Sequence, residues 1–262
     1  ELAQKQIDKG PTHPEVVAAM KSLGDLYLQC GRLTDAEKIF KRIEAMKERA
    51  LGKQHPEVAQ CLSDLARVYQ ADKKFPLAES HFKEALTIYE KVFGQDHYEV
   101  ANKLDDLVSF YLAFSRYAVA EQYASRLLSL RRKLLGEDHA DVDKARLKLA
   151  TCYYHQNKLK EAEPLYRRLA VSREQQLGPE DPEVAACLHA LADILKRQEA
   201  YDEAEPLYKR AVDIRTKKLG PQHPDVAITL ESYADLLAKT FREDEAEHMK
   251  NCARGILASQ RK

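Results

Sequence analysis

The sequence has no excess of charge of either sign, because 42 Lys and Arg residues balance 42 Asp and Glu residues among its 262 positions. A general nucleic-acid binder, or a protein that lies on an anionic membrane, needs a basic surplus, so this balance argues against both. No apolar run approaches the roughly 18 residues of a membrane span, and no secretory signal peptide is visible. We therefore expect neither nucleic-acid nor membrane partners.

Cysteine is scarce, and its spacing indicates neither metal nor disulfide chemistry. The five stand at Cys30, Cys61, Cys152, Cys187 and Cys252. None belongs to a C-x-x-C pair, so we expect no zinc ribbon and no disulfide framework, and a reducing, cytoplasmic compartment. Cys61 and Cys187 share a repeat position that holds alanine in other repeats, which predicts buried thiols. Cys252 replaces a recurrent arginine, which predicts an exposed thiol.

The motifs of common enzyme sites are missing. The sequence has no Gly-rich phosphate loop and no H-E-x-x-H, and nothing groups a nucleophile with a base and an orienting residue. His155 and His189 are expected to face one surface, where a solvated pair is the simpler interpretation. We predict that the chain is not an enzyme and that it has no cofactor and no metal site.

What the sequence does have is a repeat of 42 residues without insertion or deletion. A phrase of the form His-Pro-Glu-Val, or a variant of it, recurs at this spacing. Its first residues are His13, His55, His97, His139, Asp181 and His223. A fixed period of this length is typical of a stacked array and not of a single globular core. Such an array offers a long surface for binding but no active site by itself.

Each repeat predicts two amphipathic helices. In the second repeat, apolar residues from Val58 to Tyr69 follow an i, i+3, i+4, i+7 spacing, and a second stripe runs from Leu77 to Phe93. A polar break at 71–74 separates them. Gly94 follows the second stripe and recurs with the period, which predicts a left-handed cap. We therefore expect antiparallel pairs and call the two helices A and B.

The recurring phrase predicts the start of helix A. Proline at the first helical position loses no hydrogen bond, and the acidic residue beside it favours the positive end of the helix dipole. The preceding His, or Asp181, is then the N-cap, whose side chain accepts a backbone N–H bond. Equivalent His residues of neighbouring repeats should lie too far apart to share a metal ion. Pro164 and Pro206 fit a first helical turn if helix B begins near Lys160 and Asp202.

The repeats also agree column by column. An alanine followed by glutamate marks helix B in all six, at Ala36, Ala78, Ala120, Ala162, Ala204 and Ala246. Together with the Leu-Gly-x-x-His-Pro-x-Val junction, this pattern resembles the tetratricopeptide repeat, in a long form similar to the repeats of kinesin light chain. The resemblance implies an all-α fold, a right-handed superhelical solenoid of six antiparallel helix pairs, with helix A on the concave wall. Known members are adaptors that hold extended peptides or helices in this groove.

The period also assigns the boundaries. Residues 1–12 are expected to be the end of a preceding helix B, so that the array extends upstream. The six repeats are expected at 13–54, 55–96, 97–138, 139–180, 181–222 and 223–262. The last helix is polar, as expected of a terminal cap.

If the family geometry applies, helix A residues outside the packed stripe line the groove. The predicted peptide-binding residues are Asn102, Asp105, Ser109, Leu112, Lys144, Leu147, Thr151, Tyr154, His155, His189, Lys196 and Arg197. Leu112, Leu147 and Tyr154 are large apolar groups where solvent is expected, and Lys196 and Arg197 belong to a local positive excess. An apolar anchor ringed by charge gives a peptide groove its selectivity.

The leading hypothesis is a non-enzymatic scaffold or adaptor that binds an extended or helical protein segment, acidic and with an apolar anchor. The resemblance to kinesin light chain also implies a role as a cargo adaptor. The sequence departs from that family in helix A, where Ser63-Asp64 and Asp105-Asp106 replace its typical Asn-rich phrase. The alternative is a structural or self-associating module of a larger protein, which Phe114 and Cys252 motivate.

Overall fold

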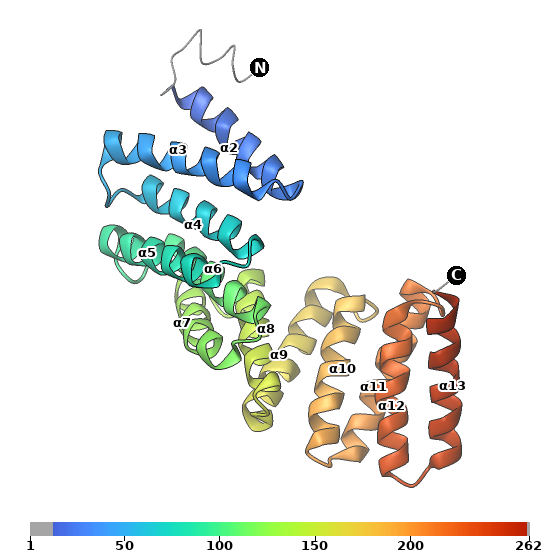
Figure 1. The fold of residues 1–262 in the computed structure, drawn as a ribbon. Helices are drawn as coiled ribbons and strands as arrows, with labels where there is room; N and C mark the ends of the chain where they lie inside the picture. The colour runs from blue at the N-terminus through green and yellow to red at the C-terminus, as the bar shows by residue number, and fades with distance from the viewer. Residues whose placement is uncertain (1–12, 261–262) are drawn as a thin grey trace. The chain divides into compact units, whose positions relative to one another are not determined.

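The computed structural model describes residues 13–260, and all regular structure within that range is helical (Figure 1). The A helices are α2 (Pro14–Gln29), α4 (Pro56–Ala71), α6 (Tyr98–Ala113), α8 (Ala140–His155), α10 (Pro182–Arg197) and α12 (Pro224–Lys239). The B helices are α3 (Leu33–Leu51), α5 (Phe75–Phe93), α7 (Tyr117–Leu135), α9 (Leu159–Leu177), α11 (Tyr201–Leu219) and α13 (Glu243–Ser259). The predicted all-α fold of helix pairs is confirmed. The helix end expected at residues 1–12 lies outside the described residues.

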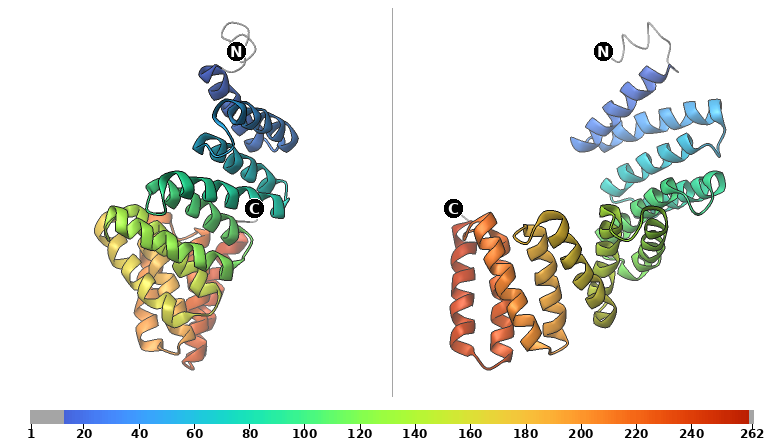
Figure 2. Two further views of the ribbon diagram at one scale, coloured as in Figure 1. Left: turned by 90° about the vertical axis from the view of Figure 1, so that its left-hand side faces the viewer. Right: turned by 180° about the vertical axis from the view of Figure 1, so that it is seen from behind.

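The chain divides into two compact units, the first ending at Gly136 and the second beginning at Glu137. Within each unit, every helix packs against the next one along the chain, as Figure 2 shows from two further sides. The interior of the second unit is built from side chains such as Leu191, Ile194 and Tyr208, which belong to one continuous cluster. Each unit therefore buries its apolar stripes between consecutive helices, as the sequence pattern predicts.

The predicted N-caps are confirmed in all six A helices. The Nδ1 atom of His13, His55, His97, His139 or His223 accepts a hydrogen bond from the backbone N–H two residues on, at 3.1 to 3.3 Å. Asp181 does the same through its carboxylate at 2.8 Å. The backbone N–H groups of the first turn have no acceptor within the helix. The Nδ1 atom of the imidazole supplies an acceptor for one of them.

The turns differ from the expectation in one respect. Gly94 ends α5 with φ 80° and ψ 170°, so its backbone lies in a region reserved for glycine and not in the left-handed helical region. The left-handed residues lie instead in the turns between helix A and helix B. They are Gly31, Lys73, Ser115, Asn157, Glu199 and Phe241, with φ between 55° and 72°.

The position of Pro164 and Pro206 was predicted wrongly. Helices α9 and α11 begin at Leu159 and Tyr201, so each proline is the sixth residue of its helix and lies beyond the first turn. The carbonyl four residues earlier, that of Lys160 in α9, therefore has no N–H partner from the helix itself.

The thiols lie where the repeat pattern predicts them. Cys61 and Cys187 are buried, and Cys252 is exposed. The interior of the second unit also contains a charge, because Arg146 is fully buried at a repeat position that is otherwise leucine or methionine. Its guanidinium pairs with Asp143 and with Glu137, whose Oε1 atom lies 2.5 Å from Nη2. A buried cation is tolerated here because carboxylates compensate it.

Candidate functional site

The predicted groove residues fall into two sets, each within one unit. In the first unit, all four lie on α6. The Asn102 amide donates to Glu99 at 3.3 Å, and the Ser109 hydroxyl donates to the backbone carbonyl of Asp105 at 2.7 Å. Asp105 faces Arg131 of α7, with 3.4 Å between Oδ1 and Nη1, and Leu112 is half-buried. These contacts stay within the α6–α7 pair, and Ser109 is exposed while Asn102 and Asp105 are half-buried.

In the second unit, five of the residues lie on α8. Lys144 is exposed and pairs with Asp141 at 2.8 Å, while the Thr151 hydroxyl donates to the backbone carbonyl of Leu147. Leu147 and Tyr154 are half-buried and pack against the core cluster. The two apolar anchors predicted on α8 therefore present an edge to solvent and not a whole side chain.

The remaining three lie on α10, and two of them, His189 and Lys196, contact Asp193. The Asp193 carboxylate lies 3.4 Å from Nε2 of His189 and 3.1 Å from Nζ of Lys196. Tyr208 of α11 donates its hydroxyl to Oδ1, and Tyr154 of α8 donates to Oδ2 at 3.4 Å. A single carboxylate thus connects three helices of the second unit and brings four donors together.

This network is fixed in its charged form at neutral pH. Burial would by itself raise the pKa of Asp193, but hydrogen bonds from His189 and Tyr208, with the nearby charges of His189 and Lys196, hold that pKa well below its usual range. Burial, and then the Asp193 charge, raise the pKa of Tyr208 and of Tyr154. Asp193 therefore stays an anion while both phenols stay hydrogen-bond donors.

The two cations at the end of α10 have different environments. Lys196 is mostly buried and also donates to the backbone carbonyl of Ser232 on α12 at 3.2 Å. Arg197 is exposed, and its guanidinium carbon lies 5.0 Å from the centre of the Tyr154 ring. Its Nη2 atom donates to Asn157 at 2.5 Å. The positive excess predicted here is therefore carried by Arg197, because Asp193 neutralises Lys196.

Sequence reasoning missed the polar residues that are buried under this face. The period of α10 gives no signal for the contact that the Tyr208 hydroxyl of α11 makes with Asp193. In the first unit, Lys103 stands where other repeats have a small residue, and it is buried. Its Nζ atom donates to Gln60 at 2.9 Å and lies 3.2 Å from Asp106. That break in a column of small residues was the available signal.

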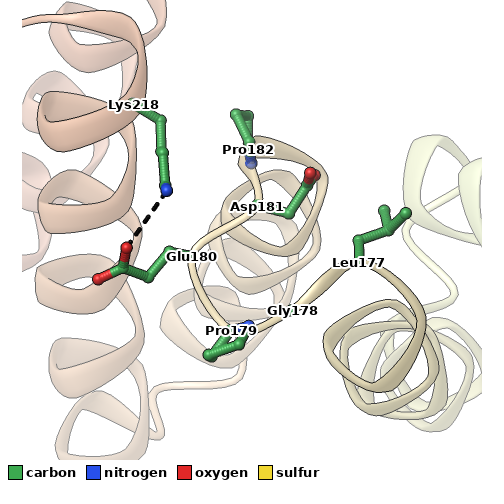
Figure 3. Close-up of a pocket in the computed structure, with 7 residues that line it drawn as sticks. All are labelled: Leu177, Gly178, Pro179, Glu180, Asp181, Pro182 and Lys218. Atoms are coloured by element: carbon green, nitrogen blue, oxygen red, sulfur yellow. Dashed lines mark ion pairs between the residues drawn. The ribbon is translucent and has the colours of Figure 1, made fainter.

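The described clefts are separate from the predicted groove residues. One of about 380 Å³ lies at the connection from α9 to α10, where Lys218 of α11 pairs with Glu180 at 3.3 Å (Figure 3). Within residues 13–260, no cluster of three or more His, Cys, Asp or Glu side chains is arranged to hold a metal ion. Each helix in that range is too short or too polar to cross a bilayer.

Comparison with solved structures shows similar folds at low sequence identity. The putative kinesin light chain repeats of Podosopora anserina give a TM-score of 0.68 at 22% identity, over 78% of this chain and 97% of that one. BtubC from P. vanneervenii gives 0.69 at 18%, over 94% and 92%. YrrB, a TPR protein with an unusual peptide-binding site, gives 0.56 at 15%, over 81% and 91%. No curated protein sequence matches the chain.

The family itself is shown by the sequence model of the tetratricopeptide repeat. That model matches residues 15–91, 99–170, 169–217 and 183–259, which is most of the chain. The matched segments contain all twelve described helices, except for terminal residues. The 42-residue helix pairs, their His caps and these matches agree, and the chain belongs to the tetratricopeptide repeat family.

Proposed function

We propose that this chain is a non-enzymatic, cytoplasmic scaffold that binds an extended or helical protein segment on the A helices of its second unit. The observation that carries the proposal is the stacking of exposed Arg197 on half-buried Tyr154. A guanidinium with further N–H donors beside an accessible aromatic edge suits a carboxylate that lies next to an apolar side chain. The partner is therefore an acidic segment with an apolar anchor.

The neighbouring contacts support one continuous surface. The Tyr154 hydroxyl of α8 donates a hydrogen bond to Asp193 of α10, and Lys196 of α10 donates one to the Ser232 carbonyl of α12. These bonds fix the three A helices beside one another, so a bound segment meets a surface that is already formed. YrrB, a structure of similar fold, is described as having a peptide-binding site, which is consistent with this use of the fold. A cargo-adaptor role like that of kinesin light chain is one form of the proposed function.

The test is binding to an array of acidic, basic and apolar-anchor peptides at low and high salt, followed by titration of the best binders. The variant is Lys144→Glu/Arg197→Glu, because both side chains are exposed. Lys196 is kept, since its loss would leave Asp193 buried without its cation. A matched control is Lys160→Glu/Lys217→Glu, which makes the same charge change on exposed positions of α9 and α11.

We expect salt-sensitive binding of acidic peptides, with an affinity at least about tenfold weaker in the groove variant and unchanged in the control. Preference for basic peptides, or an equal loss in both variants, would contradict the proposed surface. An absence of binding to every class would contradict peptide recognition.

A further inference from the structure

The three A helices of the second unit end in a basic residue, and those of the first unit do not. The last residues of α8, α10 and α12 are His155, Arg197 and Lys239, which stand one 42-residue period apart and are all exposed. The equivalent residues of α2, α4 and α6 are Gln29, Ala71 and Ala113, and the last turns of these helices contain no basic side chain. A cation near a helix C-terminus interacts favourably with the helix dipole, but that interaction is open to all six helices. Helix stability alone therefore does not explain basic residues in one unit only.

Contacts within the second unit show that these residues form a row. The Tyr154 ring centre lies 5.3 Å from that of His155 and 5.0 Å from the guanidinium carbon of Arg197. Lys196 donates to a backbone carbonyl of α12 at 3.2 Å, which holds the end of α10 beside α12. Because packed helices lie about 10 Å apart, the basic row, which consists of His155, Arg197 and Lys239, offers N–H donors at intervals of about 10 Å.

Carboxylates border the basic row on both sides. Asp235 lies one turn before Lys239 on α12; its side chain is 61% exposed, and its Oδ1 atom lies 4.0 Å from Nζ of Lys250. Such an exposed pair leaves the charge of the carboxylate largely in place. On the other side, Glu199 is exposed in the turn that follows Arg197. The strip that attracts an anion is therefore narrow.

This narrow strip favours an extended segment over a helical one. An α-helix is about 10 Å across and would lie over the bordering carboxylates, whereas extended chains pack only about 5 Å apart. The spacing of the row selects among extended conformations. A β-strand returns to the same face after two residues, or about 7 Å. The polyproline II conformation returns after three residues, or about 9 Å, which is close to the interval of the row.

We propose that the partner of the second unit is an acidic segment in the polyproline II conformation, with a carboxylate at every third residue, that crosses the ends of α8, α10 and α12. Each carboxylate pairs with one member of the basic row, and an apolar side chain between two of them packs on the half-buried ring of Tyr154. This inference rests on the proposed function and adds to it the conformation of the partner and the spacing of its acidic residues.

The test is the affinity of peptides of equal length and charge in which three glutamates beside one leucine are spaced differently. The matching peptide has its glutamates three residues apart. In the controls they are adjacent, or two residues apart as a strand requires, or seven residues apart in an alanine-rich sequence as a helix requires. We expect the matching peptide to bind at least about threefold more tightly than each control. Equal or tighter binding of a control would overturn the proposed spacing and leave the proposed function in place, whereas binding of none would contradict both.

A double-mutant cycle locates one carboxylate of the peptide at Lys239. Lys239→Gln should weaken the matching peptide about threefold, whereas Lys160→Gln, which removes an exposed lysine of α9, should not change its affinity. Glutamine in place of the glutamate at one end of the peptide should weaken binding to the parent chain but not to the Lys239→Gln variant. The glutamate at the other end should show no such coupling. If Lys144→Glu/Arg197→Glu abolishes binding but neither end couples to Lys239, the partner uses the proposed surface without following the basic row.

Discussion

Tyr208 of α11 donates its hydroxyl to Asp193 of α10, and this bond lies beneath the surface on which we expect a partner to bind. The same carboxylate accepts from Tyr154 of α8 and pairs with Lys196, which reaches α12. A charge that is mostly removed from water must be compensated by several donors, and here the donors come from different helices. The network therefore fixes both the fold of the second unit and the position of Tyr154 on its surface.

Replacing Asp193 with Asn should lower the free energy of unfolding by about 3 kcal/mol at pH 7, because Lys196 then stays largely buried without its carboxylate. The folded pKa of Asp193 lies below the unfolded one, so its contribution is complete above about pH 4 and is lost as the pH falls through the folded pKa. The difference in stability between the parent and the Asp193→Asn variant, followed by thermal unfolding, should therefore narrow below about pH 4. Asp235→Asn, the exposed equivalent on α12, should change little, and equal effects of both would contradict this role.

Glu205 of α11 should stabilise the contact with the last repeat in a similar way. The Glu205 carboxylate accepts hydrogen bonds from Tyr233 at 3.0 Å and from Arg242 at 2.9 Å. Burial alone would raise its pKa. The hydrogen bond from Lys209, followed by those from Arg242 and Tyr233, outweighs burial and lowers the pKa to about 2. Glu205→Gln should cost roughly 1–2 kcal/mol at neutral pH. Since the folded pKa is depressed, that difference should be full above about pH 4.5 and vanish towards pH 2.

The matched control for this prediction is Glu163, the same position one repeat earlier. Leu191 and Ala200 stand there in place of Tyr233 and Arg242. The cation beside Glu163 is Arg167 of its own helix, whose Nε atom lies at 2.9 Å. Glu163→Gln should therefore cost less than half as much as Glu205→Gln in chemical unfolding. A similar cost at both positions would show that the contact between repeats contributes nothing.

The sequence predicts the helices well because each is determined by short-range signals that recur six times. The His-Pro-Glu-Val phrase placed helix A correctly, and the cap at His55 was predicted together with its acceptor role. The candidate surface was predicted less fully. A helical stripe indicates which side of α10 is polar, but it cannot tell a solvated aspartate from Asp193, whose donors come from α8 and α11. Contacts between helices distant in sequence are not contained in the period of a single helix.

The His caps allow a direct test of the short-range sequence signals that determine the A helices. His55→Ala removes the acceptor for the Glu57 N–H, which lies 3.2 Å from Nδ1, and should lower the stability of the first unit by about 1 kcal/mol. His55→Asp should retain it within a few tenths of a kcal/mol, because Asp181 already performs this role at the start of α10. Urea unfolding of both variants makes the comparison. An alanine variant as stable as the parent would show that the imidazole is not a cap.

Gly24 tests how tightly the first helix pair is packed. A Cβ atom added there would lie 2.8 Å from Cζ of Phe40, whose side chain is itself buried. Gly24→Ala should gain up to about 1 kcal/mol of helix propensity but lose about 1–3 kcal/mol to overpacking, for a net loss of stability. Phe40→Leu removes the clashing ring, so the double variant should be more stable than the sum of the single effects by at least about 0.5 kcal/mol. Strict additivity in thermal unfolding would mean that α2 and α3 separate to accept the methyl group.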